Sequence, residues 1–208
     1  MKRPLAGKRK KDIRIMNYRL ILASNSPRRR TLLAGLGVDF EVRVMQDIPE
    51  DYPQGMAASE IPVHISQEKA SAYRQQMADD ELIITADTVV VAAGQILGKP
   101  LDEEDARSML RLLSGRTHQV ITGVSLTTKN EQQSFSVTTE VSFKSLSDEE
   151  INYYIRQYHP LDKAGAYGIQ EWIGYIGVTG LQGSYYNVMG LPVQRIYEEL
   201  KKMGYQFL

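Results

Sequence analysis

The sequence predicts an α/β fold built on a mixed sheet with flanking helices. Helical and strand patterns alternate along most of the 208 residues. Two long strand segments, at about 117–128 and 134–144, are separated by a turn, and the second alternates between apolar and polar residues. They predict an antiparallel hairpin, so the sheet is not purely parallel. The hydrophobic fraction of 42% is enough for a sizeable core, and we find neither an internal repeat nor a domain linker. We therefore expect a single domain over residues 17–208.

The first elements can be placed from their caps and turns. A strand at about 18–23 leads into a serine-rich turn, after which Ser26 and Pro27 take the N-cap and first positions of a helix that ends at glycines. The later expected elements are, in order, a strand at 39–44, a helix at 60–77, a strand at 82–92 with a return at 95–97, a helix from Asp102 to Gly115, the hairpin, a helix opened by the capping box of Ser147 and Glu150, short strands and loops over 165–190, and a last helix from about Pro192.

The formal net charge of zero hides an asymmetry. Residues 1–16 carry seven basic side chains and one acidic side chain, a net charge of +6, which leaves −6 for the remainder. An acidic body argues against nucleic-acid binding, which needs a basic face. The first 16 residues have no hydrophobic period and we expect them to be disordered. The alternatives are an arm that binds nucleic acid or a membrane surface, or a start upstream of the natural initiator, for which Met16 is the candidate.

Composition excludes several other classes. The sequence has no cysteine, which excludes disulfides, thiol nucleophiles and cysteine-bound metals, and its three histidines are too scattered for a three-histidine site. It has neither an apolar run that would cross a bilayer nor a secretory signal. We expect a soluble cytoplasmic protein with no membrane partner.

The turn and helix start at residues 22–30 form the first candidate site. A turn with Ser24 and Ser26 that leads into a helix N-terminus offers hydroxyls and backbone N–H groups to an anion. Arg28, Arg29 and Arg30 have the wrong charge for that end of the helix dipole, and a bound phosphate would compensate them. A capped helix with a solvated basic start explains this segment equally well.

Asp87 gives a stronger signal, because it interrupts a strand rich in isoleucine and valine. A carboxylate is costly there unless it is paired or bound to a metal. Asp87, followed by Thr88, suits a magnesium ligand or a general base, and we favour this over an edge-strand aspartate that caps a turn.

Two lysines and a glutamine are weaker candidates. Lys69 lies on the apolar stripe of its helix, where it would either extend to solvent or reach into a cleft. Lys99 lies in a constrained Gly-Lys-Pro loop and could contact the same anion. Gln170 ends a segment of small residues and offers the donor and acceptor pair that suits a nucleobase edge.

Taken together, these segments resemble the Maf family from about residue 18 to residue 205. The matching motifs, in order, are Ser24-x-Ser26-Pro27-Arg28-Arg29, Ala86-Asp87-Thr88-x-Val90, Gly98-Lys99-Pro100, Leu113-Ser114-Gly115-x-x-His118-x-Val120-x-Thr122-Gly123-Val124, Asp162-Lys163-Ala164-Gly165-x-Tyr167-x-Ile169-Gln170, and Gly183-Ser184-Tyr185-Tyr186-Asn187-Val188-x-Gly190-Leu191-Pro192.

The resemblance implies an elongated fold like inosine triphosphatase, with two lobes and a central cleft. It implies a house-cleaning enzyme that uses a divalent cation, Mg²⁺ or Mn²⁺, to hydrolyse a nucleoside triphosphate to the monophosphate and pyrophosphate. The arginine pair and the stretch around Gln170 are similar to the branch that acts on dTTP and UTP, and a homodimer is usual in the family.

The resemblance also implies roles for individual residues. Asp87 is the expected proton acceptor, and Arg28, Thr88 and Gln170 are expected to govern base choice. With these we group Lys69 as a second catalytic residue. The cations Arg28, Arg29, Lys69 and Lys99, with Ser24 and Ser26, would neutralise the triphosphate, and Glu50 and Asp87 would hold the metal.

The sequence departs from the branch pattern in two places. Glu171 stands where glycine usually follows the Ile-Gln pair, so a charge lies next to the base pocket. The acidic motif that contains Glu50 aligns only loosely.

Two other functions compete with this one. A regulatory nucleotide-binding protein linked to septum formation would use the serines and Arg28 but would have no use for a carboxylate beside the anion. A sugar-nucleotide transferase would need a glycine-rich nucleotidyl loop, which we do not find.

Overall fold

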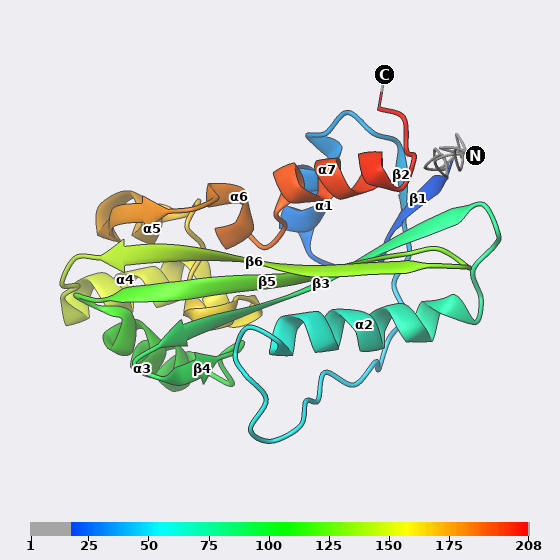
Figure 1. Cartoon of the computed structure of the whole chain (residues 1–208). Helices are drawn as coiled ribbons and strands as arrows, with labels where there is room; N and C mark the ends of the chain where they lie inside the picture. The colour runs from blue at the N-terminus through cyan, green and yellow to red at the C-terminus, as the bar shows by residue number, and fades with distance from the viewer. Residues whose placement is uncertain (1–17, 208) are drawn as a thin grey trace, which may run out of the picture.

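The computed structural model describes residues 18–207 and contains a mixed seven-stranded sheet with helices on both faces (Figure 1). The elements are, in chain order, β1 (Arg19–Leu22), α1 (Pro27–Ala34), β2 (Phe40–Val42), α2 (Ile61–Arg74), β3 (Glu81–Ala92), β4 (Gln95–Leu97), α3 (Glu103–Leu113), β5 (Thr117–Thr127), β6 (Gln132–Phe143), α4 (Asp148–Tyr158), the 3-10 helices η1 (Pro160–Asp162) and η2 (Ala164–Ala166), α5 (Trp172–Gly177), β7 (Val178–Gln182), α6 (Tyr185–Val188) and α7 (Val193–Lys202).

The strand order is β2-β1-β3-β5-β6-β7, and β4 pairs with β3. β1 runs parallel to β2 and β3, whereas β3, β5, β6 and β7 are antiparallel neighbours. The expected mixed α/β fold and the β5–β6 hairpin are therefore confirmed. The tail that was expected to be disordered, residues 1–16, lies outside the described residues.

Two large hydrophobic clusters flank the sheet at different positions along the long strands. One lies between the sheet and the helices α1 and α7, and includes Leu33 and Ile196. The other joins α3, α4 and α5 to the sheet, and includes Leu110 and Ile155. Figure 1 shows α1 and α7 on the face opposite α2 at one end of the strands, and α3, α4 and α5 at the other end. Because β3, β5 and β6 contribute to both clusters, the strands connect the two ends.

The glycine-rich stretch 165–190 differs from its prediction, because it contains the helices α5 and α6 as well as strand β7 and loops. α5 has the sequence WIGYIG, and two glycines give it a low intrinsic helix propensity. Packing stabilises it instead, since Ile173 is fully buried. A Cβ on Gly174 would lie 1.8 Å from the carbonyl oxygen of Ile169, so only glycine permits this close approach.

Along residues 18–207, none of the helices combines the length and the hydropathy needed to cross a bilayer.

Candidate active site

A cleft of about 520 Å³ opens where the central strand β3 lacks a strand partner on one edge. β1 pairs with this edge as far as Ile84, and β4 pairs with it from Val90 onward. On the other edge, β5 pairs with β3 continuously. Among the described residues, no strand fills the gap between Ile84 and Val90, so Asp87 and Thr88 belong to a central strand and still reach the cleft.

The serine turn and the start of α1 form one wall of the cleft. The hydroxyl oxygen of Ser26 caps the helix by accepting the backbone N–H of Arg29 at 3.4 Å, and Pro27 follows at the first helical position. The hydroxyl oxygen of Ser24 accepts the backbone N–H of Ser26 at 3.2 Å. Each hydroxyl retains its own proton as a donor for a ligand in the cleft.

Arg29 is held by neutral groups of the protein. Its Nε–H donates to the carbonyl oxygen of Gly190 and its Nη1–H to that of Ala86, both at 2.8 Å, and its Nη2–H donates to the hydroxyl of Thr88 at 3.2 Å. Burial lowers the pKa of Arg29, and the nearby charge of Asp87 offsets this in part. The guanidinium thus brings a positive charge to the cleft without a carboxylate in direct contact.

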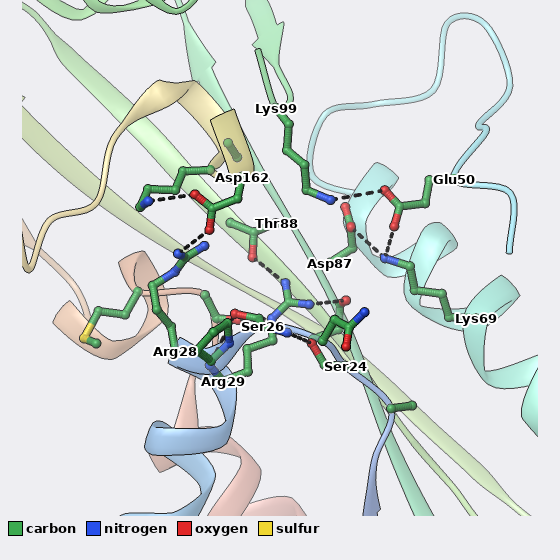
Figure 2. Close-up of a pocket in the computed structure, with 18 of the residues that line it drawn as sticks. Ser24, Ser26, Arg28, Arg29, Glu50, Lys69, Asp87, Thr88, Lys99 and Asp162 are labelled. Carbon is green, nitrogen blue, oxygen red and sulfur yellow. Dashed lines mark hydrogen bonds and ion pairs between the residues drawn. The ribbon is translucent and has the colours of Figure 1, made fainter. Parts of the chain in front are cut away.

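Arg28 points to the opposite wall, where its Nη1–H donates to the carboxylate of Asp162 at 2.8 Å (Figure 2). The second carboxylate oxygen of Asp162 accepts a hydrogen bond from Lys163 at 2.7 Å. Burial alone would raise the pKa of Asp162, but the hydrogen bonds from Lys163 and Arg28 outweigh it and lower the pKa below its ordinary value. Sequence reasoning had assigned no role to Asp162 or Lys163, although both lie in a motif that it had quoted.

Lys69 bridges two carboxylates on the α2 side of β3 (Figure 2). Its ammonium nitrogen lies 3.0 Å from Asp87 Oδ1 and 2.8 Å from Glu50 Oε1. Lys99 lies at the margin of this group, 4.0 Å from Glu50. Burial alone would raise the pKa of Glu50, but the hydrogen bond and charge of Lys69 outweigh it and lower that pKa below its ordinary value.

The carboxylates of Glu50 and Asp87 fit a divalent cation whose remaining ligands would come from a phosphate group and water. Within residues 18–207, no three side chains among histidine, aspartate and glutamate cluster as metal ligands. The two carboxylates nevertheless converge on one cationic nitrogen, so they already surround a positive charge. Mg²⁺ is commonly held by one or two carboxylates while phosphate oxygens and water supply the other ligands.

Gln170 lines the cleft from the loop that follows η2. Its Nε2 lies 3.5 Å from Oε1 of Glu171, and its Oε1 is buried without a hydrogen-bond partner. Glu171 also accepts the hydroxyl hydrogen of Tyr154 and lies 3.2 Å from the ammonium of Lys163. Glu171, noticed in the sequence as a departure from a pattern, is therefore part of a buried polar network.

The cleft brings together every residue proposed for the site from the sequence. These are Ser24, Ser26, Arg28, Arg29, Glu50, Lys69, Asp87, Thr88, Lys99 and Gln170. Their proximity is a finding, and their individual roles remain predictions.

Comparison with known proteins places the chain in a family. The model of the family described as "Maf-like protein" matches residues 19–203, and the chain belongs to the Maf family. A relative from Phocaeicola vulgatus is 64% identical over 186 residues, which is 89% of this chain and 96% of the relative, and is named "dTTP/UTP pyrophosphatase". A relative from Porphyromonas gingivalis with the same name is 54% identical over 192 residues, 91% of this chain and 96% of the relative.

Among solved structures, a HAM1 protein from Coxiella burnetii is 13% identical with a TM-score of 0.48, and covers 89% of this chain and 99% of its own.

Proposed function

We propose that this protein hydrolyses dTTP and UTP to the monophosphate and pyrophosphate. The observation that carries the proposal is the meeting of Asp87 and Lys69 with Arg28 and the serine turn in one cleft. A carboxylate beside anion-binding groups would repel a phosphate in a protein that only binds nucleotides, whereas hydrolysis requires a base at that position. Membership of the Maf family and the printed names of the relatives support the same activity.

The triphosphate would lie between the serine turn and the lysines. The N-terminus of α1 and the hydroxyls of Ser24 and Ser26 would donate to phosphate oxygens, and the cations Arg28, Lys69 and Lys99 would balance the charge. Arg29 would attract the triphosphate mainly through its positive charge and less through hydrogen bonds, because three of its N–H donors already bind protein groups.

Asp87 would act as the proton acceptor. A water oxygen attacks the α-phosphorus, the bond from that phosphorus to the bridging oxygen breaks, and pyrophosphate leaves while the carboxylate takes the water proton. Lys69 holds Asp87 in place and would neutralise charge that develops on the phosphoryl group. Glu50 and one carboxylate oxygen of Asp87 would hold Mg²⁺ or Mn²⁺, which leaves the other oxygen of Asp87 to take the water proton. When bound, the cation supplies positive charge to the phosphate oxygens and to the leaving group.

Base choice would depend on Arg28, Thr88 and Gln170. Thr88 would act indirectly, because its hydroxyl already contacts Arg29 and lies 3.0 Å from that of Thr122. Gln170 would contact the base through its amide, whose carbonyl oxygen has no partner in the protein.

A nucleotide panel with pyrophosphate detection tests the proposal. The wild type is expected to release pyrophosphate from dTTP and UTP with Mg²⁺ or Mn²⁺, and far more slowly from ATP and GTP. Asp87→Asn should lower turnover about 10²–10³-fold, and Gln170→Ala should flatten the differences between bases. Near-normal turnover by Asp87→Asn would refute the catalytic assignment. Nucleotide binding without turnover by the wild type would favour the regulatory nucleotide-binding function instead.

The organisation of the protein in the cell is part of the same proposal. Residues 17–208 would form a single catalytic domain, in keeping with the strands that the two hydrophobic clusters share. The protein would work as a cytoplasmic homodimer with nucleotide as its partner and without nucleic acid. The dimer rests on the family resemblance, and light scattering on the purified protein tests it.

A further inference from the structure

Four charged side chains of alternating sign connect the two walls of the cleft. Arg28 on α1 contacts Asp162 at 2.8 Å, Asp162 contacts Lys163 at 2.7 Å, and Lys163 contacts Glu171 at 3.2 Å. The last member of this series, Glu171, also lies 3.5 Å from the amide nitrogen of Gln170. The series therefore begins at Arg28 and ends beside Gln170, two of the residues that the proposed function assigns to base choice.

The last two members of the series, Lys163 and Glu171, are largely buried. The side chain of Lys163 is 8% exposed and that of Glu171 is 18% exposed. A buried ammonium requires charged partners, and Lys163 has Asp162 on one side and Glu171 on the other. Removal of Lys163 would leave the carboxylate of Glu171 without a cationic partner, whereas removal of Glu171 would leave Lys163 with Asp162 alone.

Both carboxylate oxygens of Glu171 already contact protein groups, so this side chain is not available as an acceptor for a nucleobase. One oxygen accepts from Tyr154, whose hydroxyl in turn accepts the backbone N–H of Gly168 at 3.0 Å. The other oxygen faces both Lys163 and the amide nitrogen of Gln170. Burial, followed by the hydrogen bond to Glu171, raises the pKa of Tyr154, so this hydroxyl keeps its proton and remains a donor. Glu171 therefore acts on other protein groups.

The contact with Glu171 determines which way the Gln170 amide is turned. A carboxylate accepts hydrogen bonds only, so the NH₂ group of Gln170 must face it, and the carbonyl oxygen is left as the unpartnered group. This buried acceptor without a partner suits a base that offers a ring N–H, as uracil and thymine do at N3. Cytosine has a lone pair at that position and is disfavoured by the same geometry.

We propose that Lys163 and Glu171 are a positioning pair that sets the base selectivity of this cleft. Glu171 orients the amide of Gln170, and Lys163, through Asp162, fixes the guanidinium of Arg28. This inference rests on the proposed function, since it explains how the same site would distinguish pyrimidine bases.

The test compares kcat/KM for UTP and CTP in the wild type and in Glu171→Gln. The neutral amide retains the shape of the side chain but cannot accept from Tyr154, Lys163 and Gln170 at once. We expect the UTP-to-CTP ratio to fall about tenfold, mainly through a higher KM for UTP with a smaller change in kcat. Lys163→Met should lower the ratio in the same direction.

Glu199→Gln provides the matched control. Glu199 is a buried carboxylate that contacts two cations, Arg195 and Lys202, on α7 away from the cleft. Its loss should lower the melting temperature and leave the UTP-to-CTP ratio unchanged. An unchanged ratio in Glu171→Gln would overturn the inference, whatever its melting temperature.

Two additions separate failure of folding or of the proposed function from failure of this inference. Glu171→Asp keeps the charge but withdraws it by one methylene, so a folded Glu171→Asp protein with wild-type selectivity also refutes the inference.

The single tryptophan, Trp172, directly follows Glu171, so its fluorescence can report UTP and CTP binding without turnover. A wild type that hydrolyses no nucleotide refutes the proposed function, and the ratio of the two affinities in wild type and variant then still decides the inference.

Discussion

Arg29 donates its Nε–H to the carbonyl oxygen of Gly190 at 2.8 Å, although the two residues are 161 positions apart. The same guanidinium donates to the carbonyl of Ala86 in β3, so one side chain joins α1, the central strand and the loop before α7. These contacts anchor the wall of the cleft that carries the serine turn. Arg29 is thus a structural anchor as well as a source of positive charge.

Arg29→Lys is expected to lower the free energy of unfolding by about 2 kcal/mol, because an ammonium cannot reach all three acceptors and leaves buried carbonyl groups without a donor. Urea unfolding measures this loss. Arg30→Lys, at an exposed neighbouring position, is the control and should change stability by less than about 0.5 kcal/mol. Equal effects of the two substitutions would contradict the anchoring role.

Gly123→Ala should be among the most destabilising small substitutions in the sheet. Gly123 pairs with Asp87 across β3 and β5, and a Cβ there would lie 2.2 Å from the carbonyl carbon of Pro62 in α2. The helix would have to move, at a cost of about 3 kcal/mol, and its displacement would also carry Lys69 away from Asp87. Thermal unfolding and pyrophosphate release should both report the change.

Gly180→Ala serves as the comparison for Gly123→Ala, since its Cβ would meet Ser142 only at ordinary contact distance, 3.6 Å. It should have little effect on either measurement. If Gly123→Ala is equally mild, the close approach of α2 to β5 does not constrain the site.

The stability of the protein should depend on pH through His118. This side chain is 2% exposed, its Nε2 lies 2.7 Å from the hydroxyl of Tyr167, and burial lowers its pKa from 6.5 to about 4. Between these values the unfolded chain binds more protons than the folded one, so stability falls as the pH decreases from 6.5 to 4. The loss attributable to His118 approaches about 3 kcal/mol.

His118→Gln should be less stable at neutral pH and should lose less stability than the wild type between pH 6.5 and pH 4. Urea unfolding across this range compares the two slopes. Identical slopes would mean that His118 does not titrate as its burial requires.

Lys69→Met should strengthen divalent cation binding to the free protein. The substitution removes the ammonium that lies between Glu50 and Asp87 and leaves two carboxylates of like charge close together. We expect Mn²⁺ to raise the melting temperature of Lys69→Met more than that of the wild type, while pyrophosphate release from dTTP falls about 10²-fold.

Lys202→Met, which removes an ammonium from Glu199 on α7, should respond to Mn²⁺ as the wild type does. The same Mn²⁺ response in Lys69→Met and the wild type would argue against Glu50 and Asp87 as the cation ligands.

Local signals in the sequence were sufficient for most elements but not for all. Ser26 with Pro27, and Ser147 with Glu150, predicted helix starts that the structure confirms through their capping hydrogen bonds. α5 was missed because its stability comes from the burial of Ile173 and from the space at Gly174 rather than from its own propensity. Lys163 and Glu171 were visible in the sequence, but nothing in their spacing indicated that they would pair.

The sequence by itself determined the alternating elements, the antiparallel hairpin and the set of residues that resemble a nucleotide site. Local periodicity, capping and motif order carry this information, and none of them requires distances between remote residues. The tertiary structure decided that β1 stops at Ile84 and β4 begins at Val90, which opens the cleft at Asp87. It also decided the partner of each charge, such as Asp162 for Arg28. Which charged residues pair depends on which distant segments the packing of the sheet and helices brings together. An ion pair requires its two groups to lie within a few ångströms in space, whatever their separation along the chain.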